Sequence, residues 1–266
     1  MRLLCLLLVL LVGAWPAFAS EKAEQLAEAM RLDQVAQILA EEGDIYRREV
    51  DETLLDNAGG DFFQAQVQDI YDPNWMRNQM RDAFAAQMSD GQMDQAIVFY
   101  ESDLGQTVVS LENSARRAFL TPEIEEMARA TYKDALADSV LFELVTEFIG
   151  VNDLVEQNVQ GTLSAQYNFF KGMTLGQPGD DAELLAQLLA EQDAKTEDTT
   201  EWLYSFLLMA YAPLDEAEMR EYIAFSRTKT GQALNTALFD GFDQMFNTIS
   251  FQLGEAVAQV LNGSDL

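Results

Sequence analysis

The chain has 266 residues with 45 acidic and 16 basic side chains and no histidine, which gives a formal net charge of −29. Nucleic-acid binding requires lysine and arginine to neutralise phosphates, so this charge argues against a nucleic-acid partner and disfavours an anionic membrane surface. Without histidine there is no imidazole base and no zinc site of the usual kind. We therefore expect no enzyme activity, no catalytic residue, no metal site and no cofactor.

The first nineteen residues predict a signal peptide. Arg2 precedes an apolar run from Leu3 to Val12 that contains Cys5, the one cysteine of the chain, and Ala17-Phe18-Ala19 is the small-x-small pattern that signal peptidase cleaves. The run is shorter than the roughly 20 apolar residues of a membrane-spanning helix, although an uncleaved N-terminal anchor is the alternative. We expect cleavage after Ala19, a periplasmic protein, and no stable membrane insertion after cleavage.

Helical periodicity covers nearly the whole chain, which predicts an all-α, multi-helix bundle. The first helices are expected at 23–41 and 45–55, with Gly43 and Asp44 between them, followed by a turn at 56–61 and a short helix from 62 to about 70. A helix at 74–87 precedes a pair at 91–101 and 103–118. Thr121-Pro122-Glu123 then combines an N-cap, a proline at the first helical position and an acid in the first turn, so a helix is expected from there to about residue 149.

A further helix is expected at 151–171, and the sequence GQPGDDAE at 176–183 predicts a linker or sharp turn. We place the boundary between an N-terminal helical region, 20–175, and a C-terminal helical region, 176–266, at this segment. A second break is expected at AKTEDTTEW, residues 194–202. Helices at 201–211, 216–226 and 229–261 complete the chain.

One pattern occurs twice, 126 residues apart. The pattern M-x-x-x-I-x-F-x-x-[ST]-x-x-G-Q covers 93–106 and 219–232, and a tryptophan lies upstream of each copy, at Trp75 and Trp202. It predicts a duplicated αα-hairpin, at about 75–120 and about 201–250, in which a hydroxyl caps the second helix and a glycine allows close approach. The shared positions are Phe99, Ser102, Gly105, Gln106, Phe225, Thr228, Gly231 and Gln232.

The second copy also contains S-x-x-K and K-T-G, from Ser226 to Gly231, which are active-site patterns of penicillin-binding proteins and serine β-lactamases. In those enzymes the two lysines are different residues, whereas Lys229 would have to be both. The first copy has Asp103 at the position of this lysine and Tyr100 at the position of the serine. We interpret the two patterns as a coincidence.

The segments AIVFYESDLGQTVVSLENSARRAF and YIAFSRTKTGQALNTALFDGFDQMF resemble two copies of the motif of DUF2059, a bacterial family of domains of unknown function. The openings MRLDQVAQILAEEG and IYDPNWM are similar to versions from marine and photosynthetic α-proteobacteria. The matching positions are Phe99, Ser102, Gly105, Phe225, Thr228 and Gly231, while Asp103 and Lys229 stand where the family commonly has proline. The resemblance implies a secreted, all-helical fold with no assigned activity.

We expect a non-catalytic module that binds an unknown protein partner. The expected interaction surface surrounds the hairpin turns and includes Tyr100, Ser102, Gln106 and Gln232, together with Arg116 and Arg117. The arginine doublet stands out in an acidic chain, but pairing with nearby acids of the same chain is the simpler interpretation.

Two other hypotheses remain open. The protein could carry an apolar small molecule or lipid between its helices, next to residues such as Met209, Phe242 and Met245, and an enclosed cavity of a few hundred Å3 would favour this over a filled core. The third hypothesis is a carboxylate-based hydrolase, since 45 acids make chance carboxylate pairs plentiful.

Overall fold

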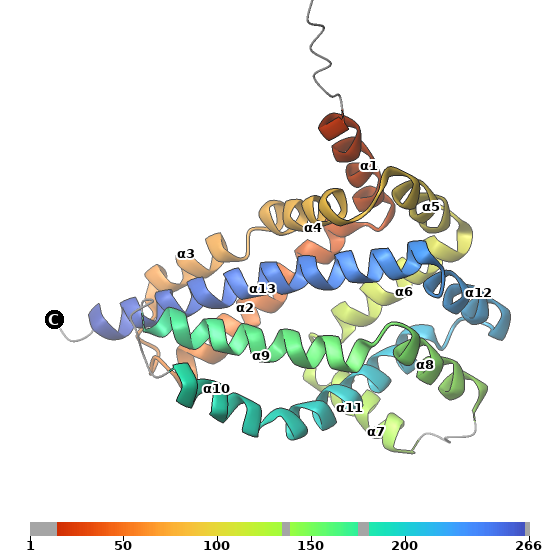
Figure 1. Ribbon diagram of the computed structural model, residues 1–266. Helices are drawn as coiled ribbons and strands as arrows, with labels where there is room; N and C mark the ends of the chain where they lie inside the picture. Colours follow the sequence, from red (N-terminus) through yellow and green to blue (C-terminus); the bar gives the residue numbers. More distant parts are fainter. Residues whose placement is uncertain (1–14, 135–138, 175–180, 264–266) are drawn as a thin grey trace, which may run out of the picture.

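The computed structural model describes residues 15–134, 139–174 and 181–263, and within these ranges all regular secondary structure is α-helical (Figure 1). The predicted all-α, multi-helix fold is confirmed. None of the helices in the described ranges is long and apolar enough to cross a membrane. The predicted signal peptide lies mostly outside these ranges.

The helices follow one another with short connections. The first part of the chain forms α1 (Trp15–Ala29), α2 (Leu32–Thr53), α3 (Gly60–Ile70), α4 (Pro73–Gln87), α5 (Asp90–Tyr100) and α6 (Asp103–Ala118). The remainder forms α7 (Pro122–Asp134), α8 (Val140–Val151), α9 (Leu154–Met173), α10 (Asp181–Ala190), α11 (Gln192–Tyr211), α12 (Glu216–Ser226) and α13 (Lys229–Gly263).

Side-chain caps explain where several helices begin. Asp72 accepts a hydrogen bond from the Trp75 N–H (2.7 Å), and Pro73 occupies the first position of α4. Capping boxes open α5, with Ser89 and Gln92, and α12, with Asp215 and Glu218. Each cap satisfies N–H groups that have no partner within the helix, so these starts are fixed by local sequence.

The first predicted break was wrong. The chain turns at Arg31, whose φ of 51° is left-handed, and α2 then runs through Gly43 without interruption. Gly43 is required by packing instead, because a Cβ at this position would lie 2.5 Å from the Tyr71 ring. A glycine inside a helix therefore marks a close contact here, not a helix end.

Two other predicted boundaries also differ. The expected helix from 121 to 149 is two helices, α7 and α8, and residues 135–138 between them lie outside the described ranges. The expected break at 194–202 does not occur, because α11 is continuous through it. Thr196 and Thr200 donate hydroxyl hydrogen bonds to carbonyls one turn earlier, which lets polar residues remain inside this helix.

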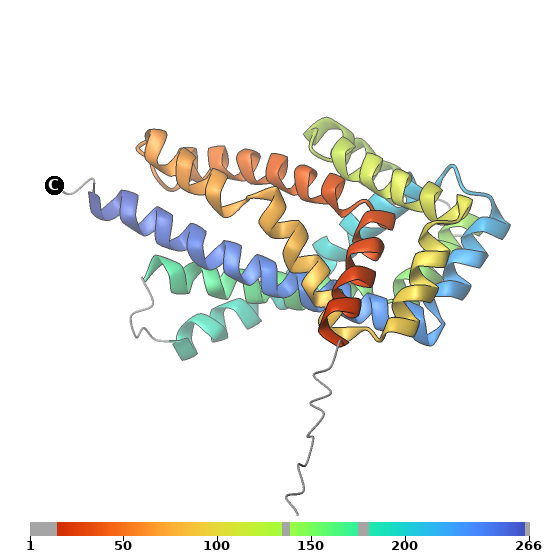
Figure 2. The same cartoon turned by 90° about the horizontal axis from the view of Figure 1, so that it is seen from above.

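Helix α13 is the central element of the core. It packs along α9 and also contacts α3, α4 and α5, so residues from both predicted regions share one set of contacts. Most of the predicted linker at 176–183 lies outside the described ranges. In Figures 1 and 2, α13 extends from α12 to the opposite end of the molecule, where α3, α10 and the C-terminal part of α9 lie. We call this the α3–α10 end.

Candidate functional site

The turn between α5 and α6 is held by side chains of the predicted motif. Ser102 Oγ accepts from the Gly105 N–H (3.1 Å) and donates to the Phe99 carbonyl (2.6 Å). A Cβ on Gly105 would overlap the Phe99 carbonyl oxygen and lie 2.6 Å from Tyr100 Cα. The glycine is therefore required for this close approach of the two helices.

Gln106 ties this turn to the turn between α1 and α2. Its side-chain NH2 donates to the carbonyls of Tyr100 (2.6 Å) and Ala29 (2.8 Å), and its Oε1 accepts from Arg31. The side-chain amide of Gln106 therefore makes its hydrogen bonds within the fold.

The turn between α12 and α13 has the same local contacts. Thr228 Oγ1 accepts from the Gly231 N–H (2.9 Å) and donates to the Phe225 carbonyl (2.7 Å). A Cβ on Gly231 would overlap the same carbonyl oxygen and lie 2.8 Å from Ser226 Cα. Gln232 donates to the carbonyls of Ser226 (2.7 Å) and Val151 (3.2 Å).

The two turns meet through their phenylalanines. The rings of Phe99 and Phe225 are parallel to within 4°, with centroids 3.9 Å apart. Tyr100 packs edge-on against Phe225, with the ring centroids 5.9 Å apart. The structure therefore brings together two motifs that are 126 residues apart in sequence.

A carboxylate and two tyrosine hydroxyls form the most unusual cluster next to this junction. Glu112, on α6, accepts hydrogen bonds from Tyr211 on α11 (2.6 Å) and Tyr222 on α12 (3.2 Å). Tyr211 is fully buried and Tyr222 is 6% exposed. Tyr100 is also buried, and burial together with the nearby Glu112 charge raises its pKa. We call these four residues the Glu112 cluster.

The environment of the Glu112 cluster favours the uncharged forms of its members. Burial raises the pKa of Glu112, while the hydrogen bonds from Tyr211 and Tyr222 oppose this by stabilising the carboxylate. The pKa values of Tyr211 and Tyr222 are raised well above the usual value, first by burial and second by the neighbouring Glu112 charge. The cluster can therefore hold a proton on Glu112 at a pH at which exposed glutamates are ionised.

Sequence reasoning missed Glu112 because it is one of 45 acids. One signal was available, however: at the 126-residue offset of the repeated pattern, Glu112 corresponds to Leu238. An acid at a position that is apolar in the other copy is the kind of exception that marks a polar group held between helices.

The serine of the S-x-x-K pattern is buried and hydrogen-bonded within α12. Ser226 is 5% exposed and donates its hydroxyl to the Tyr222 carbonyl (3.1 Å). Thr228 caps α13, and Gly231 lies within its first turn. Ser226, Thr228 and Gly231 therefore belong to the turn between α12 and α13 and its hydrogen bonds.

The expected interaction surface is only partly at the surface. Tyr100 is 4% exposed and so lies in the core. Arg116 forms a bidentate pair with Glu42 (2.7 and 3.0 Å), and Arg117 pairs with Glu41 (2.9 Å), which joins α6 to α2. The arginine doublet thus has the intrachain partners that were its simpler interpretation.

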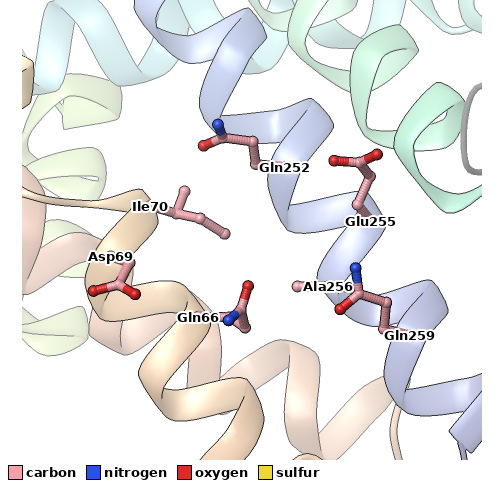
Figure 3. Close-up of a pocket in the computed structure, with 7 residues that line it drawn as sticks. All are labelled: Gln66, Asp69, Ile70, Gln252, Glu255, Ala256 and Gln259. Carbon is pink, nitrogen blue, oxygen red and sulfur yellow. The ribbon is translucent and has the colours of Figure 1, made fainter.

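Two open grooves lie elsewhere. The first, of about 300 Å3, lies between α3 and α13 near the α3–α10 end, and in it Gln66 of α3 faces Ala256 and Gln259 of α13 (Figure 3). The second, of about 590 Å3, lies between α7 and α11 and is lined by charged residues including Arg129, Lys133 and Glu201. The first groove is mainly polar, whereas the second combines these charged groups with an apolar surface of similar extent. Across the described ranges, no three acidic side chains come close enough together to hold a metal ion.

Residues 74–141 match the family described as "Uncharacterized protein conserved in bacteria (DUF2059)". The match supports the resemblance to this family over about a quarter of the chain, from α4 to the start of α8. Nothing among the curated proteins or the solved structures matches the chain.

The matched segment contains the first hairpin and two members of the Glu112 cluster, Tyr100 and Glu112. Ser102, Gly105 and Glu112 lie within it, whereas Tyr211 and Tyr222 lie about 100 residues further along the chain. The cluster is therefore completed only by helices outside the matched segment.

Proposed function

We propose that the protein is an exported, non-catalytic module that binds another protein through its α3–α10 end. The observation that carries this proposal is the distribution of large exposed hydrophobic side chains. Eight of the eleven on the described residues belong to the C-terminal half of α2 and the residue after it, to α3, to α10 or to the C-terminal parts of α9 and α13: Ile45, Tyr46, Leu54, Phe62, Phe170, Leu185, Leu189 and Leu261. Exposed apolar side chains concentrated at one end of a molecule favour an interaction site there.

The charge at this end favours one kind of partner. Exposed acids, among them Glu52, Asp56 and Asp61, lie beside the apolar side chains of α2 and α3. The amide-lined groove between α3 and α13 adds groups that can donate to and accept from a peptide backbone. The partner is a protein with an apolar contact surface and a basic rim, because opposite charges guide association and fix its orientation.

The carrier of an apolar ligand is the second candidate, and the packing of its suggested residues weighs against it. Met245 is fully buried in the cluster around α2, α3 and α13, whereas Met209 packs against a different cluster around α8, α11 and α12. Phe242 packs between two core clusters. These side chains fill the core and do not line one shared space.

Site-specific photocrosslinking in the cells that make the protein tests the proposed surface. A photoreactive phenylalanine analogue replaces Phe62, which is 49% exposed at the α3–α10 end, or Val98, which is 72% exposed on α5. We expect one discrete protein adduct from position 62, lost when Leu189→Glu is added, and none from position 98. Equal adducts from both positions, or none from position 62, would contradict the proposal.

Native mass spectrometry of protein taken directly from the periplasm distinguishes the carrier. The proposal expects the mass of residues 20–266 alone. A discrete excess mass that extracts into organic solvent would favour an apolar ligand instead.

A further inference from the structure

The helices before α7 and those after it share their buried positions. In α4 the buried residues are Met76, Met80, Ala83 and Phe84, and 127 residues further on the buried residues of α11 include Leu203, Leu207, Ala210 and Tyr211. In α5 they are Met93, Ala96, Ile97 and Tyr100, and 126 residues further on those of α12 are Met219, Tyr222, Ile223 and Ser226. Both helices of each pair therefore present the same face to the core.

The correspondence extends to the start of each half. Arg31 and Asp153 both have left-handed backbone angles, with φ of 51° and 52°, and they open α2 and α9. Gln106 donates to the Ala29 carbonyl beside the first of these turns, and Gln232 donates to the Val151 carbonyl beside the second. The order α1–α6 is thus repeated as α8–α13, with α7 between the two series.

The two series also pack against each other reciprocally. Helix α13 contacts α4 and α5 of the first series, and α6 contacts their counterparts α11 and α12 of the second. Phe99 stacks on Phe225, which is its own counterpart. A residue that meets its own counterpart lies close to the axis that relates the two copies, and reciprocal contacts define a twofold, isologous interface.

We propose that the chain is two copies of one six-helix unit, paired about a pseudo-twofold axis through Phe99 and Phe225. The surface on which the two halves meet is then a docking surface for another unit of the same kind. In this chain the docking surface of each unit is covered by the other unit of the same polypeptide. The inference does not depend on a partner at the α3–α10 end.

The two sides of this interface have diverged at one place. On one side Leu238 lies in the same apolar cluster as Phe84 and Ala96. On the other side their counterparts are Glu112, Tyr211 and Tyr222, which form the hydrogen-bonded cluster. The carboxylate and the hydroxyls on the polar side require one another as hydrogen-bond partners. Pairing of the first half with the second provides these partners, so it differs from a pairing of two identical halves.

Mixing full-length variants tests the docking surface. Two double variants place like charges on the axis within one chain: Phe99→Lys/Phe225→Lys and Phe99→Glu/Phe225→Glu. When a half of one variant pairs with a half of the other variant, opposite charges meet on the axis instead. Both rings are only partly buried, so a charge at either position still reaches solvent. Phe99→Lys/Phe225→Glu is the matched control, with the same groups in an attractive arrangement.

The proposal expects wild-type protein and the control to be monomers by light scattering. An equimolar mixture of the two like-charge variants should form a species of twice the monomer mass that contains both chains. A mixture that contains only monomers, while the control folds as the wild type does, would overturn the proposal.

If the control variant fails to fold, hydrogen exchange on single alanine variants tests the proposal instead. Phe99→Ala and Phe225→Ala should each increase amide exchange in both hairpins, α5–α6 and α12–α13, to a similar extent. An increase confined to the substituted hairpin would overturn the proposal.

Discussion

At Glu112 one carboxyl group joins helices from both halves of the molecule. It is the acceptor for Tyr211, which is fully buried, and for Tyr222, which is nearly so. A buried hydroxyl without an acceptor is costly, by roughly 1–3 kcal/mol, so the cluster is stable only while all its members are present. Its charge state depends on pH.

Glu112→Gln should change how stability depends on pH. Because burial raises the pKa of Glu112 above 4.5, the folded chain holds this proton more tightly than the unfolded chain does. Its contribution to stability is therefore fully present below the unfolded pKa and is lost as pH rises through the folded pKa. Each whole unit by which the pKa is raised corresponds to about 1.4 kcal/mol.

Glutamine keeps an acceptor for Tyr211 and does not titrate. In urea unfolding at several pH values, the stability of Glu112→Gln relative to wild type should grow as pH rises from about 4.5. The exposed Glu52→Gln is the control for the change of one unit in net charge. Parallel curves for wild type and Glu112→Gln would show that Glu112 does not titrate differently in the fold.

Among the helix pairs, α9 and α13 pack closely because glycines lie at their contact. A Cβ on Gly172 would overlap the Phe251 carbonyl oxygen, and a Cβ on Gly254 would overlap that of Phe169. Ser164 and Asn168 on α9 hydrogen-bond to Asn247 on α13 a little earlier along the same contact (2.8 and 3.1 Å). The two backbones thus approach closely where small residues face each other.

Gly254→Ala should separate these helices and destabilise the protein by about 1–3 kcal/mol, the usual cost of overpacking. Hydrogen exchange should rise in α9 and in the C-terminal half of α13. The control is Gly150→Ala in α8, where a Cβ meets nothing within 4 Å, and it should be neutral or stabilise by up to about 1 kcal/mol. Similar stability losses for both variants would mean that helix packing does not explain why residue 254 is a glycine.

For the whole molecule, the main electrostatic feature is self-repulsion. The net charge is −29, and the basic side chains are used in local pairs such as Arg77 with Glu24 and Asp33. Surface ion pairs in general add little to stability, whereas an excess of like charge opposes the compact state over the entire surface.

The melting temperature should therefore rise by several degrees when salt is increased from 10 mM to 500 mM, because a shorter Debye length weakens the repulsion more than it weakens close pairs. Calorimetry with sodium chloride measures this. Potassium chloride should act in the same way, since screening does not distinguish the two. A melting temperature that falls with salt would mean that the ion pairs outweigh the repulsion.

The sequence alone determined the features that depend on neighbours along the chain. Helical periodicity and the caps at Ser89, Ser102 and Thr228 are local, so the fold class and these helix starts could be predicted. The tertiary structure decided the rest. It showed that Gly43 is a contact and not a helix end, and that Tyr100 lies in the core. It also brought Glu112 to Tyr211 and Tyr222, because a contact across about 100 residues depends on how helices pack and leaves no local pattern.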